Sequence, residues 1–92
     1  MSVHAVSFQL SGTGSYPAFF NDIRTYEYCK VHETLWLVGL PGDNENDVVY
    51  NFLQKHITNN DFLVVIKVDG DRLKKMQGWV KPQVWAWLRA QA

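Results

Sequence analysis

The sequence has few of the features that mark secreted or membrane-bound chains. Cys29 is the only cysteine, so no disulfide can form within the chain and the reducing cytoplasm is the expected compartment. No apolar run approaches the roughly 18 residues needed to cross a bilayer, and the N-terminus lacks a basic stretch followed by a long apolar one. We therefore expect a soluble, cytoplasmic protein with no membrane partner.

The chain also lacks an excess of charge of either sign. Nine basic and nine acidic residues give a formal net charge of zero, which argues against a protein that grips nucleic acid chiefly by neutralising phosphates. The charges are unevenly placed, because residues 43–61 are mainly acidic and residues 67–81 mainly basic. The basic stretch, with Arg72, Lys74 and Lys75, is the one candidate basic patch, and a solvated surface loop is the alternative.

Motifs for catalysis or metal binding are missing as well. His4, His32 and His56 share no metal-ligand spacing; we expect a packed, hydrogen-bonded His56 and a turn at His32. Residues 12–15 lack the third glycine and the Lys-Ser/Thr pair of a phosphate-binding loop, which favours a flexible connection. Cys29 lies close to His32 in the sequence, but a strand and a turn are expected to hold the two side chains apart, so a catalytic thiol is not expected. We expect no catalytic residue, no metal and no cofactor.

Aromatic residues, by contrast, are plentiful. Four Trp, four Tyr and five Phe supply more aromatic area than a core of this size usually hides. With 92 residues the chain is expected to form one domain, spanning residues 1–92, around one core. Part of the aromatic surface is expected to meet a partner.

Four segments are predicted as strands from their β-branched and aromatic residues and their alternating polarity. They are residues 3–10, 28–31, 34–40 and 62–68. The second and third are expected to form a hairpin, with one long bent strand as the alternative. A short edge strand is expected at 78–80.

Helical spacing of apolar residues, with a capping residue or a proline in the first turn, predicts three helices. They cover about 16–26, a segment that begins after Asn44 or Asn46 and ends near residue 57, and a last segment from Pro82. The order β-α-β-β-α-β places the chain in the two-layer α+β class, with an extra C-terminal helix.

Two faces of the sheet need cover. In the first strand Val6, Phe8 and Leu10 point to the core, and the opposite face carries Ala5, Ser7 and Gln9. Residues 35–40 and 62–68 are apolar in both alternating sets, so both of their faces should be buried.

Two helices shield only one side of a four-stranded sheet. The other side bears Ala5, Trp36 or Leu37, and alternate members of 62–68, and we expect a second copy of the chain to cover it. The candidate interface residues are Ala5, Ser7, Trp36, Trp79 and Trp87. Base stacking by Trp36, Trp79 and Trp87 beside Lys74 and Lys75 is the alternative use of these tryptophans.

Four short motifs span almost the whole chain. They are the first strand with Gln9 near its end, the hairpin of residues 28–38, the block 60–66, and the ending Gly78-Trp79 with residues 85–88. Together they resemble the SinR-like small proteins, which belong with the CRISPR-associated Cas-two proteins and the VapD toxins. The resemblance implies a ferredoxin-like fold, a homodimer joined through its sheets and, in some members, metal-dependent hydrolysis of nucleic-acid phosphodiesters.

The resemblance also implies where chemistry would occur. Active members keep an aspartate at the end of the first strand, one from each subunit, around a divalent cation, and this position matches Gln9. A neutral amide brings no negative charge to a Mg²⁺ site. The expectation is therefore a homodimer without nuclease activity that binds a protein or, weakly, a nucleic acid.

Two alternatives stay open: a Mg²⁺-dependent endonuclease acting on RNA or DNA, and a small-ligand regulatory domain. The first would need a metal recruited by substrate phosphates, by Asp22 or by Asp43. The second would use the loop after the first strand and the groove between the two subunits. The candidate binding residues are Ser7, Gln9, Ser11, Arg72, Lys74 and Lys75.

Overall fold

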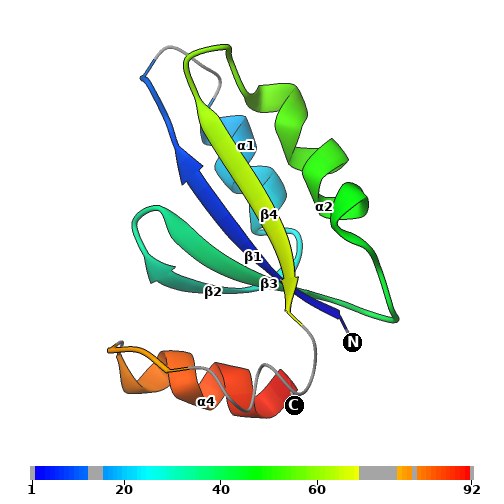
Figure 1. Cartoon of the computed structure of the whole chain (residues 1–92), viewed down its shortest axis with the longest axis vertical. Helices are drawn as coiled ribbons and strands as arrows, with labels where there is room; N and C mark the ends of the chain where they lie inside the picture. Colours follow the sequence, from blue (N-terminus) through cyan, green and yellow to red (C-terminus); the bar gives the residue numbers. More distant parts are fainter. Residues whose placement is uncertain (1, 13–15, 69–76, 80, 92) are drawn as a thin grey trace.

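Four strands alternate with short helices along the chain. The computed structural model describes residues 2–12, 16–68, 77–79 and 81–91. In chain order the elements are β1 (Ser2–Gln9), α1 (Tyr16–Ile23), β2 (Glu27–His32), β3 (Leu35–Leu40), α2 (Asn46–Leu53), the 3₁₀ turn η1 (Gln54–His56), β4 (Phe62–Val68) and α4 (Pro82–Gln91). The strands form one antiparallel sheet in the order β2-β3-β1-β4 (Figure 1). The α+β class and the hairpin are confirmed.

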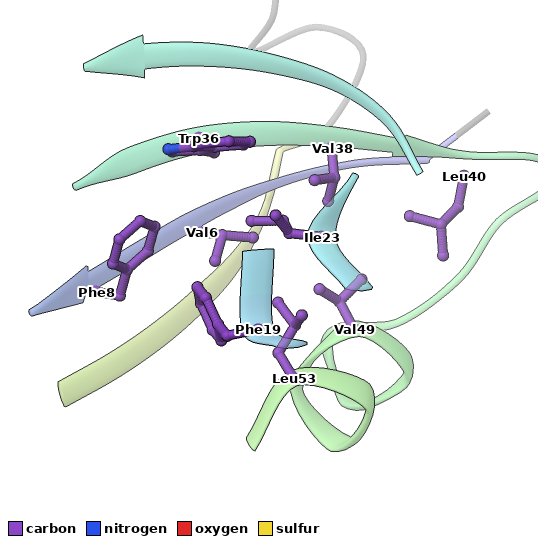
Figure 2. Packing of buried hydrophobic residues seen from close by; sticks show 9 residues of the cluster. All are labelled: Val6, Phe8, Phe19, Ile23, Trp36, Val38, Leu40, Val49 and Leu53. Carbon is purple, nitrogen blue, oxygen red and sulfur yellow. The ribbon is translucent and has the colours of Figure 1, made fainter. Parts of the chain in front are cut away.

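The main core lies between the sheet and the pair α1 and α2. Period-two alternation places Val6 and Phe8 of β1 on this face, as predicted, and Leu10 is partly buried beside them. Phe8 and Phe19 pack edge to face with their ring centroids 5.1 Å apart. Figure 2 shows the nine buried residues of this cluster: Val6, Phe8, Phe19, Ile23, Trp36, Val38, Leu40, Val49 and Leu53.

Both helices over the core are shorter than their apolar spacing predicts. α1 ends at Ile23, where the backbone N–H and the hydroxyl of Thr25 both donate to the carbonyl oxygen of Asp22, at 3.1 and 2.6 Å. Tyr26 lies beyond this turn yet still packs on the core. α2 ends at Leu53 and continues as η1. A turn can also keep a side chain on the apolar face, so the helical spacing of apolar residues continues past the end of the helix.

Histidine side chains tie these elements together. His56 Nε2 lies 2.6 Å from Asp22 Oδ2, which joins η1 to α1 and confirms the predicted packed, hydrogen-bonded His56. This hydrogen bond is the main reason that the pKa of Asp22 is lowered, with the Lys55 ammonium contributing in the same direction. His4 is buried, and its Nδ1 lies 2.8 Å from Asn46 Oδ1 at the start of α2.

The second face of the sheet is covered in part by α4. Val84 and Leu88 are buried against Val3 and Leu37, and α4 lies on the side of the sheet opposite α1 and α2 (Figure 1). Half-buried residues surround this second cluster: Ala5, Cys29, Val31, Val68, Trp85 and Trp87. The chain itself therefore covers a region that the sequence analysis assigned to a second copy.

The register of β3 decides which of its residues faces α4. Leu37 pairs with Ala5 of β1 and lies on the second face, whereas Trp36 pairs with Val6 and lies in the main core. Trp36 is only 2% exposed, and its ring stacks on Tyr28 with centroids 5.4 Å apart. Of the two alternatives, Leu37 is the residue on the second face, and Trp36 is removed from the candidate interface.

The C-terminal region differs from the prediction in one respect. Residues 77–79 are not in a strand, and Val80, the last residue of the predicted edge strand, lies outside the described residues. The helix begins at Pro82, as predicted. In the part of the chain that the structure describes, no helix has the length and apolar character to cross a membrane.

Candidate functional site

The end of β1 and the start of β4 form a groove on the second face of the sheet. In the register of the two strands Gln9 pairs with Phe62, and Ser7 with Val64. These residues, with Phe8 and Thr34, line a cavity of about 390 Å³, which we call the Gln9 groove. Ser7 and Gln9 are exposed, so the structure brings two predicted binding residues together in a space large enough for a small ligand.

Asp61 holds the loops around this groove. Its Oδ1 accepts hydrogen bonds from the Ser11 N–H and the Tyr16 hydroxyl, both at 2.6 Å. Its Oδ2 accepts from the N–H and the hydroxyl of Thr58, at 2.8 and 3.0 Å. The Tyr16 hydroxyl also accepts from the Gly12 N–H at 2.9 Å. Ser11 and Gly12, which follow β1, are thereby tied to the residue that precedes β4.

This network controls the charge of Asp61. Burial opposes the ionised form, but the hydrogen bonds donated by Tyr16, Ser11 and Thr58 outweigh it and hold the pKa of the carboxyl well below its usual range. Both oxygens of the carboxylate are occupied by these donors. Asp61 therefore has a structural role. Its carboxylate stabilises the turn at Thr58 and the residues after β1, and it is not available to bind a ligand in the groove.

None of the described residues that line the groove with Gln9 is a carboxylate. The residues that line the cavity are neutral, and among the described residues no cluster of three His, Cys, Asp or Glu side chains could hold a metal ion. The amide of Gln9 and the hydroxyls of Ser7 and Thr34 donate and accept hydrogen bonds. The groove can therefore recognise neutral polar groups beside an apolar wall.

That apolar wall continues along β4. Phe62, Val64 and Ile66, which we call the β4 stripe, are 66, 52 and 57% exposed. Because alternate residues of a strand share a face, all three lie on the second face beside Gln9, Ser7 and Ala5. α4 reaches only Val68 at the far end of this strand. The stripe is the apolar part of the second face that the described chain leaves uncovered, and the exposed Ser7 and Gln9 lie beside it.

β4 is also an edge strand without the usual protection. It pairs only with β1 in the described residues, its pairing is continuous over seven residues without a bulge, and it contains no proline. Lys67 is its one charged residue, and it pairs with Asp43 at 2.5 Å and Glu45 at 3.3 Å. Natural proteins usually blunt such edges with charges, proline or bulges, so β4 is a surface suited to pairing.

The other predicted interface residues are distributed over the molecule. Ala5 and Ser7 lie beside the β4 stripe. Trp87 is half-buried in the α4 cluster. Trp79 is fully exposed and lines a cavity with Val31 and His32 of β2, at the opposite edge of the sheet from β4. A single patch on β4 cannot include Trp79, which needs a separate explanation.

The remaining predicted binding residues divide into two groups. Ser11 is exposed at the end of β1, where its N–H donates to Asp61. Arg72, Lys74 and Lys75 lie outside the described residues. The structure therefore places Ser7, Gln9 and Ser11 at one end of β1 and gives no account of the basic stretch.

Sequence reasoning missed Asp61 and Tyr16. Asp61 stands in the polar run 58–61, whose composition indicates only a break between a helix and a strand. The spacing of Thr58 and Asp61 is a local signal for a side-chain turn, but the bonds to Ser11 and Tyr16 join positions 50 and 45 residues apart.

The chain was also compared with known proteins. No match is found among models of protein families, among curated proteins or among solved structures. A function for this chain therefore follows from its own residues rather than from a relative.

Proposed function

We propose that the chain is a homodimeric binding module of the cytoplasm, built on a ferredoxin-like sandwich with an extra C-terminal helix. The element order and the strand order β2-β3-β1-β4 support this fold. The SinR-like kind, in the Cas-two and VapD-like superfamily, is the family whose motifs the chain resembles. The β4 stripe, exposed on an unprotected edge strand, is the observation that carries the proposal.

A second copy of the chain is the proposed occupant of the stripe. A two-fold interface places the same patch on both subunits, so an apolar stripe meets its own copy without any further complementarity. The chain has a net charge of zero, so little long-range repulsion separates two copies. A stable interface buries about 800 Å² on each partner, and the proposed contact therefore extends from the stripe onto Ala5, Ser7 and Gln9.

Binding rather than hydrolysis is the activity that the site supports best. At the position where active relatives would hold an aspartate, Gln9 offers a neutral amide in a groove lined by neutral side chains. Asp61, the one buried carboxylate among the described residues, has both oxygens occupied. In the proposed dimer the Gln9 groove lies within the contact, where its neutral lining meets the second copy.

Light scattering on the pure protein at micromolar concentration tests the proposal. We expect a mass twice the 10.6 kDa of one chain. Ile66→Lys places a charge in the middle of the interface and is expected to give a folded monomer. Val48→Lys is the matched control, because Val48 is 45% exposed on α2, away from the stripe, and it should remain dimeric. A folded wild-type monomer would contradict the proposal.

Incubation with labelled RNA and DNA in the presence of Mg²⁺ or Mn²⁺ separates binding from phosphodiester hydrolysis. We expect no cleavage that depends on this protein, because no carboxylate stands among the described residues that line the Gln9 groove. Gln9→Ala is the control for contaminating nuclease. Cleavage that persists through purification and is lost in Gln9→Ala would establish the endonuclease instead.

A further inference from the structure

A second groove lies at the opposite edge of the sheet from the β4 stripe. It runs between the outer edge of β2 and the start of α4, and it consists of two adjoining cavities of about 440 and 470 Å³ that share Val31, His32 and Lys81. Each cavity has the volume of a small-molecule site. We call this surface the β2–α4 groove. A two-fold interface on β4 leaves it open.

Trp79 is the feature that needs an explanation. Its side chain is fully exposed, and fully exposed tryptophans are uncommon because burial of the large indole ring is so favourable. Trp79 lines one cavity together with Val31 and Pro82. An indole ring beside an apolar floor is a surface on which a flat ring can stack.

The polar residues of the groove favour an anion. Lys81 lines both cavities, and it makes no ion pair with another residue of the described chain. Lys30 lines one cavity and pairs with Glu33 at 3.0 Å on the surface, a contact that an incoming anion would share. Two ammonium groups against one carboxylate leave this groove with a positive balance.

His32 adds a directed donor. Its Nδ1 accepts a hydrogen bond from the Thr34 N–H at 3.2 Å, so in the neutral imidazole the proton is on Nε2. His32 lines both cavities. An N–H donor next to two ammonium groups suits a phosphate, which has several acceptor oxygens.

We propose that the β2–α4 groove binds a planar aromatic ring that carries a phosphate, the chemistry of a nucleoside monophosphate, with the ring on Trp79 and the phosphate near Lys81 and His32. The inference goes beyond the proposed homodimer and does not depend on it. Two sources share this chemistry, a free mononucleotide and the phosphorylated end of a nucleic acid. The charged lining of the groove disfavours a second copy of the chain as occupant.

Isothermal titration with AMP, adenosine and inorganic phosphate tests the proposal. AMP is expected to bind at least tenfold more tightly than either half alone. Trp79→Ala should weaken AMP binding about tenfold, because stacking of a base on an aromatic ring is lost. Lys81→Gln should weaken it about fivefold and reduce its dependence on salt. Both residues are exposed, so circular dichroism should show an unchanged fold.

The matched controls are Tyr50→Ala, an exposed aromatic residue on α2, and Arg89→Gln, an exposed cation at the far end of α4. Both should bind AMP like the wild type, as should monomeric Ile66→Lys, which keeps this test separate from that of the dimer. An adventitious ion only, seen as equal affinity for phosphate and AMP, would overturn the proposal. So would unchanged affinity in Trp79→Ala and Lys81→Gln, or no binding at millimolar AMP.

A short 5′-phosphorylated single-stranded oligonucleotide identifies the source of the ligand. If the oligonucleotide binds more tightly than AMP and Trp79→Ala abolishes this binding, the proposed site is supported and its ligand is the phosphorylated end of a nucleic acid. If the oligonucleotide binds no more tightly than AMP and Trp79→Ala abolishes this binding, the proposed site is supported and its ligand is a free mononucleotide. Oligonucleotide binding that Trp79→Ala leaves unchanged counts against the groove as the site.

Discussion

At the scale of single residues, Asp61 and Gln9 have opposite relations to their surroundings. The Asp61 carboxylate is buried and accepts hydrogen bonds from three residues, so it is held in place and both of its oxygens are occupied. The Gln9 amide is exposed in a groove whose described lining is neutral, on the surface proposed for the second copy. The acidic residue at this end of the sheet therefore serves stability, and the neutral one is the candidate for recognition.

Replacement of Asp61 tests its structural role. Asp61→Asn keeps the shape but puts an amide NH₂ where two donors now point, so we expect the melting temperature at pH 7 to fall by about 5–10 °C. Thermal unfolding followed by circular dichroism measures the change. Asp47→Asn, at an exposed aspartate in the first turn of α2, is the control and should shift the melting temperature by less than about 3 °C.

The stability difference between the wild type and Asp61→Asn is expected to depend on pH. The pKa of Asp61 is lowered in the folded state. Ionised Asp61 therefore stabilises the folded protein fully above the unfolded pKa of about 3.9, and this stabilisation decreases as the pH falls below that value. The difference between wild type and Asp61→Asn should therefore shrink between pH 5 and pH 2. A difference that stays constant with pH would show that the charge of Asp61 is not what stabilises the fold.

The faces of individual residues could be predicted where only one set of alternating residues is apolar. In β1 this rule assigned Val6 and Phe8 to the core and Ser7 and Gln9 to the other face, as the structure has them. In β3 both sets are apolar, so the sequence left Trp36 and Leu37 as alternatives. Pairing with β1 and packing against α4 decide between them, and neither is local information.

At the scale of secondary structure, the sequence predicted strands better than helix ends. Residues 62–68 were predicted as a strand and form β4 with the same bounds. The start of α4 at Pro82 was also predicted, because proline marks the first turn of a helix. The end of α1 was not, because it depends on hydrogen bonds of Thr25 to the Asp22 carbonyl that spacing alone does not reveal.

α4 is the element whose position the sequence left open. Its buried pair Val84 and Leu88 was recognised as a face, but the surface against which this face packs lies more than 40 residues away, at Val3 and Leu37. No local pattern links these residues. The cover that α4 provides reduces the surface left for a second copy to the β4 side of the sheet.

Truncation of a buried α4 residue tests this cover. Leu88→Ala removes a side chain that is 4% exposed, and we expect the free energy of unfolding in urea to fall by about 2–4 kcal/mol. Gln83→Ala, at an exposed position of the same helix, should change it by less than about 0.5 kcal/mol. Equal effects of the two substitutions would mean that α4 does not pack on the sheet in solution.

At the scale of the whole molecule, the two edges of the sheet differ in chemistry. The β4 edge is apolar, continuous and almost uncharged, and it is the surface proposed for a second copy. The β2 edge has Trp79, His32 and Lys81 around its cavities, and it is the surface proposed for a small aromatic anion. The two surfaces lie at opposite ends of the strand order, so both can be occupied in one dimer.

Oxidative cross-linking at the centre of the stripe tests the central claim most directly. Val64 lies between Phe62 and Ile66, and the central residue of a two-fold patch lies close to its own copy. Val64→Cys in a Cys29→Ser background should form a covalent dimer under mild oxidation, because disulfides need Cα atoms within about 7 Å. Val48→Cys in the same background should stay uncrosslinked. A Val64→Cys variant that crosslinks no faster than this control would contradict the account.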